Sequence, residues 1–354
     1  MRIVAAMSGG VDSSVAASLL AEAGHDVIGL SMQLYDQRES PDAFGSCCSL
    51  DDLYDARRVA SAIGIPHYIV NFEAQFQATV VDNFVREYAA GRTPIPCVHC
   101  NAGLKFATLL ERAAGLGAAA VATGHYARVT FDEDNRRYRL LRGVDADKDQ
   151  SYFLFSLTQE QLAHAVFPVG HLTKPDVRAH AGRLGLSVAA KPDSHEICFV
   201  PDGDAGGFVE RRMGRREHAG DIVDTSGRVL GRHRGIHRLT VGQRKGLGLA
   251  AGTPLYVLRL EPAASRVVVG PREELGSVTL SASAVNWIAG EPPSNPRRVT
   301  ARIRHRHKDA PAIVTADGDR RASLLFDEPQ IAVTPGQAVV FYDGEEILGG
   351  GWID

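Results

Sequence analysis

The chain has 354 residues, with 39 lysines and arginines against 42 aspartates and glutamates, so its net charge near neutral pH is −3. Its length indicates two or three domains. A content of 44% hydrophobic and 23% charged residues is typical of a folded, soluble protein. No apolar run reaches the length of a membrane span, and the first residues lack the layout of a signal peptide. We therefore expect a cytoplasmic, monomeric protein with no membrane partner.

Strand-like and helical segments alternate through the first third of the chain. Hydrophobic periodicity predicts strands at 3–7, 27–34, 67–71 and 118–123, and helices at 12–23, 53–63, 73–89 and 101–114. Two alternating runs at 126–143 predict a hairpin, and Pro175 and Gly185 frame a helix at 174–185. This alternation predicts an α/β fold, a parallel sheet with helices on both faces.

The composition and the hydrophobic pattern of the sequence change after about residue 200. Glycine and proline become frequent, and the glycines of 202–210 are typical of a linker. We expect no further helices. Short β-rich runs at 255–260, 266–269, 278–280, 312–315 and 338–342 predict two small barrels. The predicted domains are 1–200, 201–275 and 276–354.

The stretch from Ser8 to Ser14, SGGVDSS, joins the first strand to the first helix. Glycines let backbone N–H groups approach an anion closely, and a helix start adds free N–H donors. The stretch matches neither the dinucleotide-binding glycine pattern nor the Walker A motif. A carboxylate at Asp12 would repel phosphate, so we expect it to hold Mg²⁺ or a backbone N–H.

Two strongly basic stretches lie in the second half of the chain. Residues 211–245 contain ten lysines and arginines against three acidic residues, and residues 297–308 contain six, with two histidines and no acidic residue. One such stretch would usually be a solvated surface. Two in one chain favour a surface that binds a polyanion.

Further motifs follow in order along the chain. They are TPIPCVHCNAGLKF (93–106), ATGHYAR (122–128), KDQSYFL (148–154), SHEICFV (194–200), HRLTVGQRKGLG (237–248), PLYVL (254–258) and PGQAVVFYDG (335–344). SGGVDSS resembles the PP-loop of the ATP pyrophosphatases, and the whole set resembles the tRNA-specific 2-thiouridylase family (MnmA/TrmU) from Met1 to the C-terminus. The resemblance implies a PP-loop domain, a central barrel and a C-terminal tRNA-binding barrel. It also implies ATP- and Mg²⁺-dependent 2-thiolation of the wobble uridine (U34) in the tRNAs for Lys, Glu and Gln, with a cysteine desulfurase or sulfur-relay protein as partner.

The resemblance also assigns residues. It places ATP on Ala6, Met7, Ser8, Gly9, Gly10, Val11, Asp12, Ser13, Met32 and Gly124, and tRNA on Ile95, Pro96, Cys97, His125, Lys148, Asp149, Gln150, Arg304, His305 and Gln337. Cys198 matches the persulfide carrier and Cys100 its partner nucleophile. The chemistry fits these residues. Adenylation of the C2 oxygen creates a leaving group, and one thiol carries a sulfur that the other frees.

One departure concerns the segment before Cys100. The family string Asn-Pro-Asp-x-x-Cys reads Ile95-Pro96-Cys97-Val98-His99-Cys100 here, so the acid is replaced by a third catalytic candidate, Cys97. Three thiolates could hold a [4Fe–4S] cluster with one open iron. A persulfide mechanism with an extra thiol, and a zinc site completed by His99 or His195, are the alternatives. No role is predicted for Cys47 or Cys48.

Two other functions remain open from the sequence. The chain could be a tRNA-binding or sulfur-relay protein with a vestigial nucleotide site, although the intact SGGVDSS argues against this. It could also be an adenylating relative of argininosuccinate or GMP synthetase, although those enzymes need neither paired cysteines nor basic barrels.

Overall fold

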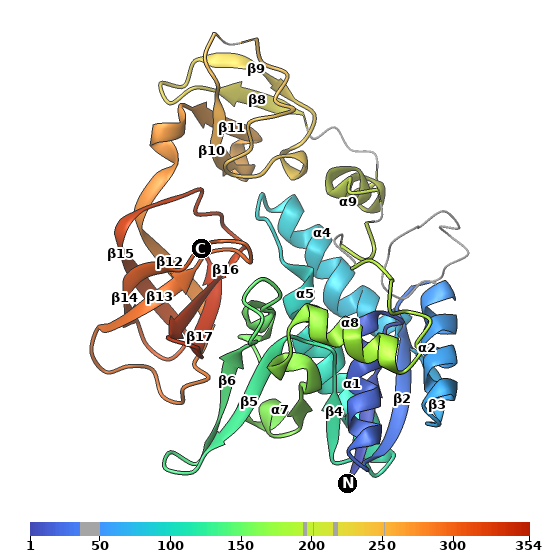
Figure 1. The fold of residues 1–354 in the computed structure, drawn as a ribbon. Coiled ribbons are helices and arrows are strands. Elements are labelled where there is room, and N and C mark those ends of the chain that lie inside the picture. Colours follow the sequence, from blue (N-terminus) through green and yellow to red (C-terminus); the bar gives the residue numbers. More distant parts are fainter. Residues whose placement is uncertain (36–49, 194–196, 201, 215–218, 251) are drawn as a thin grey trace.

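A computed structural model describes residues 1–35, 50–193, 197–200, 202–214, 219–250 and 252–354. Its strands form three sheets of five, four and eight strands. Figure 1 shows the α/β part at the N-terminal end of the chain, the four-stranded sheet at the opposite end of the molecule, and the C-terminal barrel beside the α/β part. In these described residues no helix is long and apolar enough to cross a membrane.

The five-stranded sheet is parallel and has the order β3-β2-β1-β4-β7. Its strands are β1 (Arg2–Ala6), β2 (Asp26–Gln33), β3 (His67–Asn71), β4 (Ala120–Ala122) and β7 (Ala165–Val166). The first four strands begin and end within two residues of the predicted bounds. Apolar residues on both faces, such as Val4 and Ile3, are buried in two different cores, as a covered parallel sheet requires.

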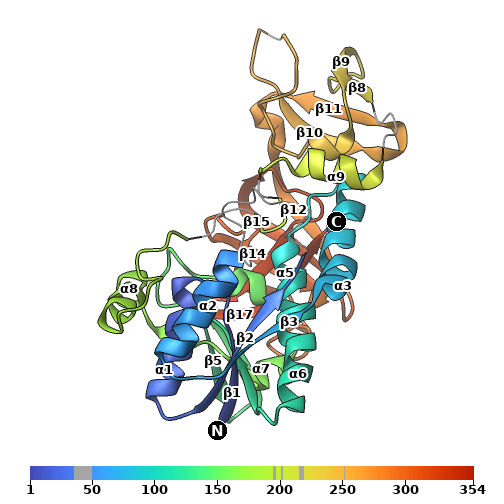
Figure 2. The ribbon, with the colours of Figure 1, turned by 90° about the vertical axis from the view of Figure 1, so that its right-hand side faces the viewer.

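Helices cover both faces of this sheet, which confirms the predicted fold class (Figure 2). On one face lie α1 (Val11–Glu22), α2 (Leu50–Ala62) and α8 (Lys174–Arg183). On the other lie α3 (Glu73–Phe76), α5 (Pro96–His99), α6 (Leu109–Gly115) and α7 (Gln159–Ala163). Helix α4 (Asp82–Ala89) follows α3 and packs Phe84 in a separate small core with Val200 and Val209. The π-helical segments Gln77–Val81 and Cys100–Thr108 join α3 to α4 and α5 to α6. Each predicted helix of this region is thus present, two of them with an internal π segment.

The C-terminal barrel contains β12 (Gly276–Asn286), β13 (Arg297–Arg302), β14 (Ala310–Ala316), β15 (Arg321–Ile331), β16 (Ala338–Asp343) and β17 (Glu346–Ile353). The pairing of β12 with β17 closes these six strands. The predicted hairpin, β5 (Ala127–Asp132) and β6 (Arg137–Arg142), extends this sheet through β6–β17 pairing. Glu346 reinforces the junction with ion pairs to Arg137 and Arg139. The barrel is therefore attached directly to the α/β part.

The four-stranded sheet has the order β10-β11-β8-β9 and its own small core. Its strands are β8 (Gly220–Val223), β9 (Val229–His233), β10 (Tyr256–Glu261) and β11 (Arg266–Gly270). Strands β10 and β11 were predicted from the sequence. Strands β8 and β9 of this sheet, and β13, β15 and β17 of the C-terminal barrel, were not. The domain boundaries at 200 and 275 stay predictions.

The expectation of a linker at 202–210, with no helix beyond residue 200, is wrong. Helix α9 spans Ala205–Met213. The carboxylate of Asp204 accepts a hydrogen bond from the Gly207 N–H at 2.8 Å and so caps the helix. Phe208 packs with its ring 6.0 Å from that of Phe84. Capping and tertiary packing thus outweigh the low helix propensity of the two glycines.

Candidate functional site

The SGGVDSS stretch forms a tight loop between β1 and α1, as predicted. Gly9 has φ = +75°, and a Cβ there would lie 2.2 Å from the Asp52 carbonyl oxygen. Gly10 is the N-cap of α1. The Ser13 hydroxyl accepts the Ser8 N–H at 3.1 Å and donates to the Gly10 carbonyl at 3.1 Å. The serine side chains therefore hold the loop in one shape at the N-terminus of α1, where the first N–H groups of a helix can serve an anion.

A cavity of about 620 Å³ opens at the carboxyl edge of the parallel sheet, beside this loop. This is the edge at which α/β folds bind ligands. A Cβ on Gly124, just after β4, would lie 2.5 Å from the Ser13 backbone nitrogen, so only glycine permits this close approach. The cavity is lined by nine of the ten residues predicted for ATP, namely Ala6, Met7, Ser8, Gly10, Val11, Asp12, Ser13, Met32 and Gly124.

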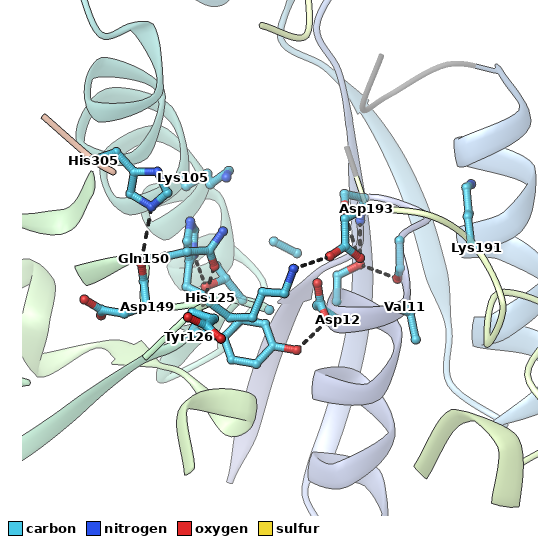
Figure 3. Close-up of a pocket in the computed structure, with 18 of the residues that line it drawn as sticks. Val11, Asp12, Lys105, His125, Tyr126, Asp149, Gln150, Lys191, Asp193 and His305 are labelled. Atoms are coloured by element: carbon cyan, nitrogen blue, oxygen red, sulfur yellow. Dashed lines mark hydrogen bonds and ion pairs between the residues drawn. The ribbon is translucent and has the colours of Figure 1, made fainter. Parts of the chain in front are cut away.

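Asp12 is held in an ionic network at the start of α1. Its two carboxylate oxygens lie 2.8 and 2.9 Å from the Lys174 ammonium. The Tyr126 hydroxyl also donates to the Asp12 carboxylate, at 2.8 Å (Figure 3). Lys174 also pairs with Asp193 at 2.7 Å, and Lys148 pairs with Asp193 at 2.8 Å. Burial acts to raise the pKa of Asp193, but hydrogen bonds from Lys148 and Lys174 outweigh it and lower this pKa to about 2.

These contacts bear on the predicted roles of Asp12. Its carboxylate binds Lys174 and Tyr126, so it is occupied by side chains where the sequence suggested Mg²⁺ or a backbone N–H. Mg²⁺ in such sites usually takes one or two carboxylates and several phosphate oxygens. Lys174 pairs with Asp12 and Asp193 at the same time, so Asp12 is the carboxylate in the loop that could serve an incoming Mg²⁺–ATP while Lys174 keeps its pair with Asp193.

Lys191, which was not predicted as a site residue, supports the Ser8–Ser14 loop by binding its backbone. The Lys191 ammonium donates to the Gly9 carbonyl at 3.1 Å and pairs with Asp52 at 2.6 Å and Asp55 at 2.7 Å. It ties the loop to α2 and lines the cavity. Lys105 and Tyr126 also line the cavity without having been predicted. Both residues lie in motifs noted in the sequence, at 93–106 and 122–128. Nothing in those motifs indicated that the two side chains would lie near the Ser8–Ser14 loop.

The far wall of the cavity comes from the C-terminal barrel. The last residue of β13 and the loop after it contribute Arg302, His305, Arg306, His307 and Lys308 to the lining. Arg302 pairs with Asp149 at 3.1 Å. The His305 ring lies 4.4 Å from the Phe153 ring. The second basic stretch of the sequence therefore faces the same cavity as the nucleotide loop.

The ten residues predicted for tRNA fall into two groups. His125, Lys148, Asp149, Gln150 and His305 line the cavity, whereas Ile95, Pro96, Cys97, Arg304 and Gln337 lie outside its lining. Ile95 and Pro96 are buried, and Cys97 and Arg304 are exposed. The Gln337 side chain donates to the Thr93 carbonyl at 3.0 Å, which docks the barrel against the segment before Cys97.

His125 is a buried member of the first group. Burial, together with the charge of Lys105, holds its pKa well below the usual value of 6.5, so the ring is neutral at physiological pH. Its Nδ1 lies 2.7 Å from the Thr123 hydroxyl. A neutral imidazole fixed in this way can offer one donor or acceptor to a base without adding charge.

The segments that contain Cys100 and Cys198 pack against the same hydrophobic core. Cys100 and Cys198 are half-buried and pack against one hydrophobic core. Phe199 places its ring 5.0 Å from Phe84 and 5.6 Å from Phe76, on the helices flanking Gln77–Val81, and α5 contacts that segment. Each cysteine also lies five residues from a cavity-lining residue, Lys105 for Cys100 and Asp193 for Cys198.

The arrangement of these thiols does not fit the predicted [4Fe–4S] cluster. Over the part of the chain that the structure describes, no three His, Cys, Asp or Glu side chains are grouped so that they could hold a metal ion. This set includes Cys97, Cys100, Cys198 and His99, so these residues form neither the three-thiolate site nor the zinc site completed by His99. The zinc site completed by His195 stays a prediction. Cys47, Cys48 and His195 lie outside the described residues.

A glycine-rich loop between strand and helix, at the carboxyl edge of a parallel sheet, defines a nucleotide-binding PP-loop fold. Three family models match consecutive parts of the chain. They are described as a tRNA methyl transferase HUP domain (1–202), a tRNA methyl transferase PRC-barrel domain (206–271) and an aminomethyltransferase β-barrel domain (277–353).

Relatives that match the full length of the chain identify the family more specifically than the domain models do. The tRNA-specific 2-thiouridylase of Geotalea uraniireducens is 56% identical over 100% of this chain and 95% of its own length. Those of Solibacter usitatus and Acetivibrio thermocellus are 55% and 48% identical, each over 99% of both chains. The chain belongs to the tRNA-specific 2-thiouridylase family, and it is an enzyme of the tRNA sulfurtransferase class. A solved 4-thiouridine synthetase bound to RNA and ATP overlaps 54% of the chain and 42% of its own, with 16% identity and a TM-score of 0.35.

Proposed function

We propose that this enzyme uses ATP to thiolate C2 of the wobble uridine (U34) in the tRNAs for Lys, Glu and Gln. ATP would bind in the loop from Ser8 to Ser14, with the adenine beside Met32 and Gly124. Asp12 would help to hold Mg²⁺, which would offset the negative charge of the phosphates. The uridine would leave its stack to reach this site, as bases must when an enzyme acts on them. The assigned roles of 1–200, 201–275 and 276–354 in ATP binding, connection and tRNA binding form part of the proposal.

One observation carries the proposal. The nucleotide loop and the basic loop of the C-terminal barrel, from Arg302 to Lys308, line one cavity. A cation-rich loop that faces an ATP site suits a substrate that is itself a polyanion, because phosphate contacts dominate RNA affinity. A small-molecule ligase would not need this second wall, which argues against an argininosuccinate or GMP synthetase activity.

The chemistry divides into two steps. The O2 oxygen of uridine attacks the α-phosphorus of ATP and pyrophosphate leaves, while N–H groups of the loop stabilise the developing charge. Cys198 carries a terminal sulfur supplied by a desulfurase or relay protein. The Cys100 thiolate attacks the Cys198 sulfur, which forms a disulfide and expels hydrosulfide. Hydrosulfide attacks C2, AMP departs, and an external dithiol then reduces the disulfide. No step passes through an iron–sulfur cluster.

The direct test is mass spectrometry of nucleosides from tRNA incubated with ATP, Mg²⁺ and a persulfide donor, without added sulfide. We expect 2-thiouridine at position 34 with the native enzyme and none with Cys100→Ser or Cys198→Ser. In both variants tRNA-dependent pyrophosphate release should continue, because adenylation precedes sulfur transfer. Thiolation by both cysteine variants at the native rate would refute the two-thiol step.

Cys97→Ser is the matched control, since it removes an exposed thiol three residues from Cys100. We expect it to keep most of the thiolation activity. Iron analysis of anaerobically purified protein provides an independent check on the cluster. Pyrophosphate release stimulated by citrulline or xanthosine monophosphate, and not by tRNA, would favour the other adenylating enzymes.

A further inference from the structure

Tyr126 joins the two walls of the cavity. Its hydroxyl donates to Asp12 at 2.8 Å, at the start of α1 in the nucleotide loop (Figure 3). Its backbone is held on the opposite side by Gln150. The Tyr126 N–H donates to the Gln150 side-chain oxygen at 3.1 Å, and the Gln150 N–H donates to the Tyr126 carbonyl at 2.9 Å. One residue is thus fixed at both ends by groups from separate segments.

The segment that holds Tyr126 is bound in turn to the barrel loop. Asp149, the neighbour of Gln150, is buried, and its carboxylate accepts the N–H groups of Gly143 and Ser151. The same carboxylate pairs with Arg302 of the barrel at 3.1 Å. The His305 ring lies 3.4 Å from the Asp149 carbonyl. A phosphate that binds Arg302 or His305 therefore competes with contacts that position Asp149 and Gln150.

The environment of Tyr126 suits a rigid connection. The side chain is buried, with 2% of its surface exposed, and packs in the core between the sheet and α1. Burial and the negative charge of Asp12 raise the pKa of the phenol, so the hydroxyl remains a donor throughout the physiological range. The hydrogen bond to Asp12 has a charged acceptor, which makes it one of the stronger kinds.

We propose that Tyr126 is a positioning residue that couples RNA binding on the Arg302–Lys308 loop to ATP binding on the Ser8–Ser14 loop. The connection runs from Arg302 and His305 through Asp149 and Gln150 to Tyr126, and from its hydroxyl to Asp12. Each link is a hydrogen bond or ion pair between described residues, except that Asp149 and Gln150 are joined directly through the backbone. This inference rests on the proposed function, since it takes ATP and tRNA as the two ligands.

The coupling between tRNA binding and ATP binding can be measured as the factor by which one ligand changes the affinity for the other. If tRNA changes the affinity for ATP by some factor, ATP must change the affinity for tRNA by the same factor. Couplings of this kind are typically about 5- to 150-fold. A residue that only stabilises the fold changes each single affinity or the amount of folded protein. A coupling residue changes the factor that links the two affinities.

The experiment measures the dissociation constant of a non-hydrolysable ATP analogue, α,β-methylene-ATP, with and without saturating substrate tRNA, by calorimetry. We expect a factor of at least about 5 for the native enzyme and less than about 2 for Tyr126→Phe, which removes only the hydroxyl. Gln150→Ala, which removes the side-chain acceptor of the Tyr126 N–H, should also lower the factor. Tyr138→Phe, on β6 and away from the cavity lining, is the matched control and should keep the native factor.

Two results would overturn the inference. One is a native enzyme that binds both ligands with a factor of 1, and the other is a Tyr126→Phe enzyme that keeps the native factor. Neither result would touch the proposed function, which fails separately if the native enzyme binds no ATP analogue or no tRNA.

Discussion

Replacing Gly124 by alanine gives a sharp test of the site, because the added methyl group has no space. Its Cβ would lie 2.5 Å from the Ser13 nitrogen and 2.7 Å from the Asp12 carbonyl carbon, both backbone atoms. Ordinary contacts of this kind begin at 3.4 Å, so the end of β4 and the nucleotide loop must separate by roughly 0.9 Å. Neither atom belongs to a side chain that could rotate away.

The magnitude follows from this displacement. Overpacking of this size costs about 1–3 kcal/mol of unfolding free energy, and at about 2–4 °C per kcal/mol the melting temperature should fall by several degrees. A shift of about 1 Å in a catalytic group can cost about 100-fold in rate. We therefore expect tRNA-dependent pyrophosphate release to fall by about 100-fold in Gly124→Ala, far more than the loss of stability explains at 25 °C.

The assay measures pyrophosphate release under saturating tRNA, together with thermal unfolding of the same sample. Gly182→Ala is the matched control, because its Cβ would meet no atom within 4 Å on α8. Alanine there should leave the rate unchanged and add up to about 1 kcal/mol of stability. A Gly124→Ala enzyme with native activity would show that the loop and β4 are not held together as described, and would refute the reasoning.

Two further predictions concern charge. Asp193 has a folded-state pKa of about 2, below its unfolded value near 3.8, so its contribution to stability is present above about pH 4 and lost as pH falls toward 2. Asp193→Asn should reduce the loss of unfolding free energy between about pH 4 and pH 2. The control Asp317→Asn, at an exposed site, should not reduce it. Identical pH profiles for the two variants would contradict the prediction. Arg306 lines the cavity on the barrel loop, and Arg306→Ala should weaken tRNA binding and reduce the slope of log K against log salt by about 1. Arg112→Ala, on α6, should leave the slope unchanged, and an equal change in both variants would argue against an RNA contact at Arg306.

The sequence by itself determined the local parts of the site. The strand at 2–6, the glycines of the loop and the helix after it are specified by neighbouring residues, so they could be read from periodicity and turn chemistry. Nine of the ten residues that the family resemblance assigned to ATP line the cavity, and seven of these nine lie between residues 6 and 13. The hairpin at 127–142 was also found, but not its pairing with β17.

Only the tertiary structure decided which distant segments meet. Lys191 supports Gly9, Tyr126 bonds to Asp12, and Arg302 reaches Asp149 across 153 positions of sequence. Such contacts depend on packing and charge complementarity between segments, and no local pattern encodes them. The same reason explains α9, whose glycines suggested a linker while Phe208 and the cap at Asp204 made it a helix. It also explains the three thiols, because a favourable spacing in sequence does not place their sulfurs around one metal.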